Sequence, residues 1–302
     1  MESRFFSVYN VEQRRLAMKD CCIRALGAHD EWCGIACEVT EALKIAVEKR
    51  HYDQNSARLV GEMLLIASML ASNLKGEDAL SVAVKDLQGN ASLVASADSH
   101  IHVKASASHP EGMPTAGRGI MQIVRDLGMK EPYSSSVSLD FSSFAGSVDA
   151  FFAQSDQILA KTKLHVSFDE SGNVKRAFGF LVEALPFASE ETKEEVLRLF
   201  SSLPSMEALE FRNLGVEEMI PLLFGKLGER VVSTKDIEWR CSCSLERVRN
   251  TLLLLGPQEL EDMANEGKTI HLDCNFCGKS YYFTVDDLRE LALSIPKQKG
   301  DA

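Results

Sequence analysis

Four of the eight cysteines in this 302-residue chain have the spacing of a metal site. They form two close pairs, Cys241 with Cys243 and Cys274 with Cys277, and thirty residues separate the pairs. Four thiolates that a fold brings to one point suit tetrahedral Zn²⁺, which lies about 2.3 Å from each sulfur and leaves no position for water or substrate. The spacing therefore predicts one closed zinc site per chain in the reduced protein, and no enzymatic activity.

The short Cys241-Ser242-Cys243 segment also makes oxidation compete with metal binding. Zinc keeps each thiolate ionised, and a thiolate is a nucleophile, so an oxidant that removes two electrons from each pair would form two small disulfide loops and release the metal. A structural zinc contributes on the order of 10 to 16 kcal/mol to folding a small unit. A disulfide that closes a three- or four-residue loop contributes only about 2 kcal/mol. We therefore expect oxidation to unfold the C-terminal part of the chain, unless the zinc has a purely structural role.

Two other groups of candidate ligands predict no site. The remaining cysteines lack a strong metal-binding spacing, and we expect them to be buried as small apolar side chains. They are Cys21, Cys22, Cys33 and Cys37. His100 and His102 alternate along a predicted strand, with His109 nearby, and we interpret them as a solvated strand face rather than a metal site.

Composition places the chain among ordinary globular proteins. Hydrophobic residues make up 45% and charged residues 25% of the sequence, which excludes global disorder. The net charge of -11 argues against a protein whose main task is to bind nucleic acid phosphates. Met1–Asp20 lacks the features of an export signal, and the most apolar run, Met63–Ala71, is about half as long as a bilayer crossing. We therefore expect a cytoplasmic protein with reduced thiols and no membrane contact.

Residues 1–185 predict an α+β core domain that is rich in antiparallel sheet. Apolar residues recur at helical spacing over residues 56–74, and alternating patterns then predict strands. The expected strands lie at 80–84, 101–103, 119–125, 133–139, 163–168 and 174–183, with one helix at 146–157.

Residues 186–232 predict a linker of short amphipathic helices. One apolar stripe there follows the i, i+3, i+4, i+7, i+8 pattern of a helix face. It consists of Val216, Met219, Ile220, Leu223 and Phe224. Because Pro221 removes one helical hydrogen bond, we expect this helix to depend on packing against another surface.

Residues 233–302 predict a small C-terminal domain that carries the zinc. About 70 residues form too small an apolar core to be stable without a staple, and the four cysteines supply one. The expected elements are helices at 244–255 and 256–265 and short strands at 268–272 and 280–283.

Motifs along nearly the whole chain match one known family. The most specific are Arg240-Cys241-Ser242-Cys243-Ser244 and Cys274-Asn275-Phe276-Cys277-Gly278. Weaker landmarks in the same order are Arg50-His51, Leu74-Lys75-Gly76-Glu77, Pro132-Tyr133, Ser155-Asp156-Gln157 and Gly179-Phe180-Leu181-Val182. With these motifs the sequence resembles the redox-regulated 33-kilodalton heat-shock chaperone (33 kDa chaperonin) family.

The resemblance implies a holdase chaperone that is inactive while it is reduced and zinc-bound. On oxidation, Cys241–Cys243 and Cys274–Cys277 disulfides form, zinc leaves, and the linker and the C-terminal domain unfold. The exposed apolar surface then binds unfolding client proteins, often as a homodimer. Within the linker, the stripe from Val216 to Phe224 is the expected client-binding surface.

Two other functional classes remain open from the residues themselves. A zinc-ribbon module for nucleic acid binding or an adaptor role would use the same cysteines structurally. Residues 233–302 carry 9 Lys and Arg against 12 Asp and Glu, however, which disfavours phosphate binding. A thiol oxidoreductase would use Cys274 and Cys277 at the start of a helix, whereas we predict them between two short strands.

Overall fold

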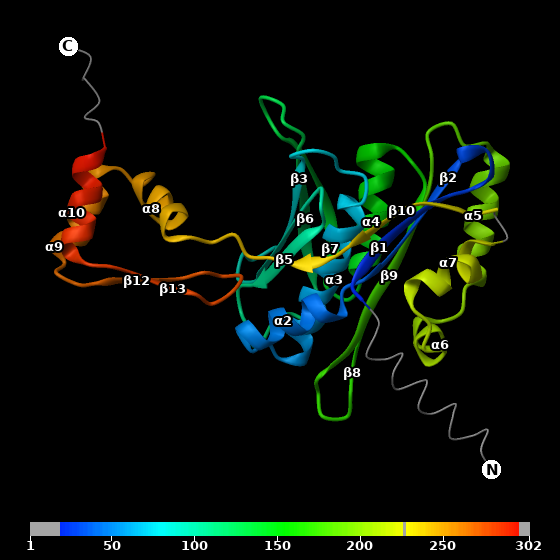
Figure 1. Ribbon diagram of the computed structural model, residues 1–302, viewed down its shortest axis with the longest axis horizontal. Helices are drawn as coiled ribbons and strands as arrows, with labels where there is room; N and C mark the ends of the chain where they lie inside the picture. Colours follow the sequence, from blue (N-terminus) through cyan, green and yellow to red (C-terminus); the bar gives the residue numbers. More distant parts are fainter. Residues whose placement is uncertain (1–18, 226–227, 296–302) are drawn as a thin grey trace. The chain divides into compact units, whose positions relative to one another are not determined.

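The computed structural model describes residues 19–225 and 228–295 (Figure 1). Most of Met1–Asp20, where the sequence lacks the features of an export signal, lies outside the described residues. The chain separates into two compact units, Met1–Arg240 and Cys241–Ala302. The predicted C-terminal domain begins at residue 233, whereas the second unit of the structure begins at Cys241. The difference arises because residues 233–239 pair with strands of the first unit. The division into a core at 1–185, a linker at 186–232 and a tail at 233–302 remains a proposal about which parts unfold separately.

One sheet of the first unit contains five antiparallel strands in the order β10-β1-β2-β9-β8. These strands are β1 (Cys21–Leu26), β2 (Trp32–Glu38), β8 (Ala160–Phe168), β9 (Val174–Ala184) and β10 (Arg230–Asp236), with the short helical turn η1 (Ala28–Asp30) between the first two. All seven residues of β2 are buried, as expected for a central strand that is covered on both faces. We call this sheet the first sheet.

The second sheet has six strands in the order β11-β5-β4-β3-β6-β7. Its strands are β3 (Ala79–Asp86), β4 (Ser92–Asp98), β5 (His102–Ala107), β6 (Arg118–Asp126), β7 (Tyr133–Asp140) and β11 (Glu238–Trp239). Alternate residues of β3 and β4 are buried, because only one face of this sheet packs against helices. The predicted antiparallel sheet is confirmed, and only β11 is added in parallel, beside β5.

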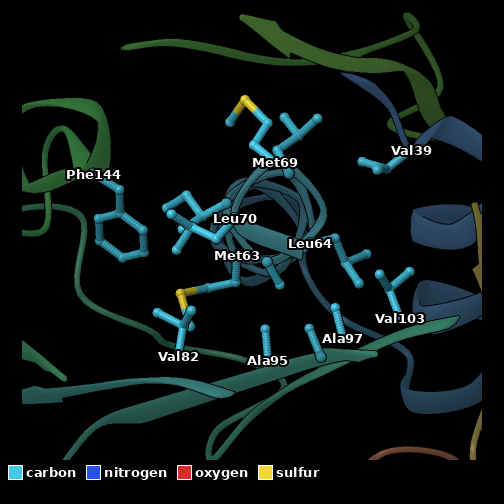
Figure 2. Packing of buried hydrophobic residues seen from close by; sticks show 14 of the residues in the cluster. Val39, Met63, Leu64, Met69, Leu70, Val82, Ala95, Ala97, Val103 and Phe144 are labelled. Carbon is cyan, nitrogen blue, oxygen red and sulfur yellow. The ribbon is translucent and has the colours of Figure 1, made fainter. Parts of the chain in front are cut away.

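Helix α3 (Gln54–Ala71) lies between the two sheets and forms the centre of the core. Asp53 caps it by accepting a hydrogen bond from the backbone N–H of Ser56 at 2.7 Å. Figure 2 shows the helix end-on, with Met63 and Leu64 close to side chains of the second sheet. Fifteen of its residues are buried, so the predicted apolar helix is confirmed. The helix packs against strands of both sheets and joins them into one core.

Two further helices complete this inner layer. Helix α2 (Thr40–Arg50) packs on β9 and β5, and α4 (Phe144–Phe151) packs on β7 and β8. The predicted helix at 146–157 is thus confirmed in part, because its second half is a π-helical turn, η2 (Phe152–Asp156). Sheets and helices together confirm the α+β class.

Three helices of the predicted linker cover the outer face of the first sheet. They are α5 (Glu190–Ser202), α6 (Met206–Phe211) and α7 (Val216–Phe224). Trp32 of β2 meets Phe224 of α7 with their ring centroids 5.4 Å apart, and a side chain at Gly34 would lie 2.9 Å from the Phe224 ring. Glycine at position 34 therefore allows α7 to pack closely on the sheet. Pro221 lies inside α7 without ending it.

The second unit is a small domain of helices around a two-stranded sheet. Its apolar core is formed by Leu252, Leu260, Ala264, Tyr281, Phe283, Leu288, Leu291 and Ala292. Its elements are α8 (Leu245–Leu253), α9 (Pro257–Asn265), β12 (Ile270–Asp273), β13 (Ser280–Phe283) and α10 (Val285–Ser294). The two helices and two strands expected here are confirmed, and α10 is additional. Of the helices in the described part of the chain, none combines the length and the apolarity that a bilayer crossing requires.

Asp20, at the start of β1, gives the first unit a specific dependence on pH. Its carboxylate accepts hydrogen bonds from the backbone N–H groups of Glu41 and Ala42 at 3.0 and 2.7 Å, but burial raises the pKa of Asp20 to about 7. Between about pH 4 and pH 7 the folded chain therefore holds a proton that the unfolded chain has lost. The free energy of unfolding should fall as the pH rises through this window.

We predict that Asp20→Asn removes this loss, which amounts to roughly 3 kcal/mol between pH 5 and pH 8. Urea unfolding followed by tryptophan fluorescence measures it at pH 5 and pH 8, because both tryptophans, Trp32 and Trp239, belong to the first unit. Asp53→Asn is the matched control, since hydrogen bonds hold the pKa of Asp53 below its ordinary value in spite of partial burial. The prediction is wrong if Asp20→Asn keeps the pH dependence of the wild type.

Candidate metal centre

The second unit brings both cysteine pairs to one place by local backbone structure. Cys241 and Cys243 directly precede α8, whose first turn is capped because Ser244 Oγ accepts a hydrogen bond from the Arg247 N–H at 3.2 Å. Cys274 and Cys277 lie in the turn between β12 and β13. There the Gly278 N–H donates to the Cys274 carbonyl at 2.8 Å, and Gly278 takes a positive φ of 70°. A capped helix start and a hairpin turn therefore fix the positions of the four sulfurs.

The four Sγ atoms lie within 4.8 Å of one another. Two of the separations cross between the pairs, at 3.6 Å for Cys241 to Cys274 and 3.4 Å for Cys243 to Cys277. Four thiolates around a tetrahedral Zn²⁺ at about 2.3 Å would be separated by roughly 3.8 Å. The donor set, its number and its spacing therefore fit one four-coordinate zinc ion.

The protonation states of the free thiols differ strongly within the cluster. Burial raises the pKa of Cys241 to about 12. Partial burial also acts to raise that of Cys243, but the Tyr281 hydroxyl and the neighbouring thiols outweigh it and lower the pKa of Cys243 to about 7. Proximity of four sulfurs thus favours one ionised thiol stabilised by protonated neighbours. A divalent cation would ionise all four, since metal ligation requires thiolates.

The position of Cys274 and Cys277 bears on the oxidoreductase alternative. Enzymes that exchange disulfides place Cys-x-x-Cys where a helix begins. Here the pair occupies a hairpin turn whose strands pair from Asp273 with Ser280 to Ile270 with Phe283. The geometry therefore supports a closed ligand site rather than a disulfide-exchange site.

The other cysteines are buried in the first unit, as predicted. Cys33 and Cys37 are fully buried, and Cys22 is 2% exposed. Cys22 and Cys37 face each other across β1 and β2, and burial raises the pKa of Cys37. They are packed in the core as small side chains, and Cys33 also accepts a hydrogen bond from Arg24 Nε at 3.1 Å.

The predicted linker stripe belongs to the first unit and not to the metal centre. Its residues are Val216, Met219, Ile220, Leu223 and Phe224, which are all at most 2% exposed. They pack on Trp32, Phe180 and neighbouring side chains of the first sheet. In this structure the stripe is therefore core, and it is accessible only after α7 leaves the sheet.

Sequence reasoning gave no role to two polar groups. Glu210 of α6 binds several side chains of the first sheet, and no local motif marks it. Asp98, His100 and His102 bring potential ligand atoms within 4.8 Å of one another. Asp98 ends β4, His100 lies in the turn and His102 begins β5. The prediction that His100 and His102 alternate along one strand is therefore wrong, because the strand begins only at His102.

Comparison with known proteins identifies relatives that cover nearly the whole chain. The family model described as "Hsp33 protein" matches residues 20–284. A protein of Agathobacter rectalis named 33 kDa chaperonin is 28% identical and aligns over 91% of this chain and 100% of its own length. Another 33 kDa chaperonin, from Lachnoclostridium phytofermentans, is 27% identical over 91% of this chain and 98% of its own. The crystal structure of a 33 kDa chaperonin from Thermotoga maritima superposes with a TM-score of 0.80 at 25% identity, covering 91% of this chain and 98% of the other.

Proposed function

The chain belongs to the Hsp33 protein family, and from this premise we propose that it is a holdase chaperone that oxidation activates. Its relatives carry the name chaperonin, and the family is one of chaperones rather than enzymes. The observation that carries the redox part of the proposal is the cluster of four sulfurs within 4.8 Å in the small second unit. Under this proposal Cys241, Cys243, Cys274 and Cys277 hold one zinc per reduced chain.

Oxidation would remove the staple of the second unit. In each pair, two thiolates lose two electrons and form one S–S bond, while peroxide takes up the electrons and two protons and becomes water. Zinc, when bound, keeps the sulfurs ionised and together. We assign the disulfides to Cys241–Cys243 and Cys274–Cys277. This pairing is taken from the family resemblance. The geometry of the cluster does not select a pairing, because every sulfur is close to the other three.

The linker would supply the client-binding surface. In the reduced structure α7 buries its apolar stripe against the first sheet, so the helix and the sheet hide apolar area from each other. Release of α5 to α7 would expose Val216, Met219, Ile220, Leu223 and Phe224 together with their partners on the sheet. A large exposed apolar patch binds other apolar chains, which suits unfolding client proteins and a homodimer of the oxidised form. A cytoplasmic location completes the proposal, because the reduced thiols of the resting state require it.

Polar contacts of Glu210 also hold the linker on the first sheet, in addition to its apolar packing. We call these contacts the linker lock. Glu210 of α6 binds His165 and Lys175 at 2.8 Å each, and it accepts a hydrogen bond from Ser167 at 3.0 Å. Partial burial alone would raise the pKa of Glu210. The contacts with the three side chains outweigh burial and hold this pKa below its ordinary value. Arg176 donates to the Leu214 carbonyl at 2.8 Å, just before α7. Three side chains from β8 and β9 therefore converge on one carboxylate of the linker.

An aggregation assay tests the proposed activity. We expect the full chain, after treatment with peroxide or hypochlorite, to suppress light scattering by a thermally unfolding client, and the reduced zinc-loaded chain to suppress it weakly. Disulfide mapping by mass spectrometry should find Cys241 joined to Cys243 and Cys274 to Cys277. Equal suppression by both forms would contradict the redox switch and leave a constitutive holdase.

Metal removal tests the staple. The reduced chain should contain one zinc, and chelation should lower the helical signal of the chain and abolish the protease resistance of the second unit. Cys243→Ser should weaken zinc binding in the same assay. Ser242→Ala, between the two ligands, is the control that should retain the metal. A second unit that stays protease-resistant without zinc would contradict the proposal.

Glu210→Gln tests the linker lock. Loss of the charge should weaken α6 docking by about 1.5 to 3 kcal/mol, the usual range for hydrogen bonds to charged groups. We expect less oxidant to be needed for half-maximal chaperone activity and faster hydrogen exchange in α6. Glu195→Gln makes the same change of charge at an exposed position of α5 and should leave both quantities unchanged. An oxidant requirement equal to that of the wild type would show that apolar packing alone holds the linker.

A further inference from the structure

Cys22 of β1 and Cys37 of β2 lie directly opposite each other in the first sheet. Both belong to the apolar core that contains α3, and the Cys22 Sγ lies 4.0 Å from the Ser68 carbonyl oxygen of that helix. The neighbouring Cys21 belongs to the cluster on the other face of the sheet, where the linker helices pack. Two thiols thus share one face and one register position, and the proposed zinc chemistry uses neither of them.

The hydrogen-bond pattern of the sheet places these two side chains at the closer kind of cross-strand position. The Gly27 N–H donates to the Trp32 carbonyl at 3.1 Å, and the register of β1 with β2 continues from there without a shift. Because bonded and non-bonded pairs alternate along an antiparallel ladder, the two cysteines form a non-hydrogen-bonded pair. The ladder of β2 with β9 gives the same result, since the Leu185 N–H donates to the Glu31 carbonyl at 2.8 Å and the alternation then directs the backbone groups of Cys37 toward β9.

This position suits a disulfide. The Cα atoms of a non-hydrogen-bonded pair are about 4.5 Å apart and the side chains are close. Disulfides join Cα atoms that are roughly 4.4 to 6.8 Å apart. The two strands can therefore be bridged without a change of register.

We propose that Cys22 and Cys37 are a second oxidisable site, at which peroxide forms a disulfide between β1 and β2. One sulfur, as the thiolate, attacks peroxide, breaks the O–O bond and becomes a sulfenic acid. The other thiol then attacks that sulfur, so that the S–S bond forms and the sulfenic oxygen leaves as water. Together the two thiols lose two electrons and two protons, and peroxide becomes two molecules of water.

Burial keeps this pair reduced while the first unit is closed. Cys37 is fully buried, and burial together with the neighbouring Cys22 thiol raises its pKa. A thiol with little thiolate character reacts slowly with oxidants. On its other side β1 is covered by β10, where Lys235 is opposite Cys22. Loss of β10 would leave β1 as an edge strand with one ladder, and its opening would expose both thiols. This order of events rests on the proposed function, whereas the ability of the pair to form a disulfide does not.

The disulfide would preserve the sheet face on which clients are proposed to bind. Ile23 and Ala25 of β1 and Trp32 of β2 belong to the same apolar cluster as the α7 stripe. Without β10, this face depends on an edge strand. A link from β1 to the central strand β2 reduces the entropy of the opened state and so favours the closed sheet. Oxidation thus stabilises the first unit while it unfolds the second.

Disulfide mapping of the full chain after peroxide treatment tests the proposal. We expect Cys22 linked to Cys37 in the wild type, and trypsin makes the link visible because it cleaves between them at Arg24. Cys22→Ala and Cys37→Ala should each abolish the link. Cys21→Ala is the matched control, since this thiol lies on the opposite face of the sheet and its loss should leave the link unchanged. The proposal is wrong if the wild type forms no such link, or if Cys22→Ala yields the same pair of linked peptides as readily.

The rate of link formation tests the role of β10. Peroxide should form the link faster in the chain from which zinc has been chelated than in the reduced, zinc-loaded chain. Equal rates in the two forms would contradict gating by β10.

Hydrogen exchange measures what the link does to the sheet. The amides of β1 should exchange roughly 100-fold more slowly in the oxidised wild type than in oxidised Cys22→Ala, the effect expected for closing a loop of this length. The same comparison on the reduced proteins corrects for the packing of the lost thiol. Equal exchange in the two oxidised proteins would contradict the stabilising role. Neither measurement uses a client, so failure of this site is distinguishable from failure of the proposed function.

Discussion

The second unit depends on one constraint, which is that its apolar core is small and has cysteine side chains packed at its edge. Eight side chains are buried in it, and Cys243 and Cys274 pack at the edge of the same group. Two of the residues that would bind the metal therefore also pack against the core, and the four cysteines come from the start and the middle of the unit. Loss of the cluster would separate the start of α8 from the β12–β13 hairpin. A core of this size has little remaining burial to offset the entropy of the freed chain.

A second constraint is that the two apolar faces of the first sheet are each covered by a different layer of helices. The first sheet is covered on its inner face by α3 and on its outer face by α5 to α7. The inner contact comprises most of a long helix, whereas the outer contact is made by three short helices of which α5 and α6 are largely exposed. Short helices have little stability of their own. The outer layer is therefore the one that a modest loss of free energy can release, while the inner layer preserves the fold.

The sequence was most informative where a local pattern and its structure coincide. The helix around Met63, the alternation in β3 and β5, and the cysteine spacing are all local signals, and each led to the correct element or cluster. Strands β1 and β2 were missed because nearly all of their residues are buried, which removes the alternation that marks a strand. Helix α10 was missed although Thr284 and Asp287 form a capping box at its start. No local sequence pattern predicts the linker lock around Glu210. His165, Ser167 and Lys175 come together at Glu210 only because β8 pairs with β9.

The topology sets the route by which a change in the second unit can reach the linker. The linker helices are bounded on one side by β9, in the middle of the first sheet, and on the other by β10 at its edge. Between β10 and Cys241 the chain also adds β11 to the edge of the second sheet. Unfolding that starts at the cysteines must therefore break the two-residue β11 and then the seven-residue β10 before α7 is freed from its C-terminal side. Edge strands separate more easily than central ones because only one ladder must break, so β11 and β10 are suited to transmit the change. The short β11, which pairs with β5 through only two residues, is therefore the first step on this route.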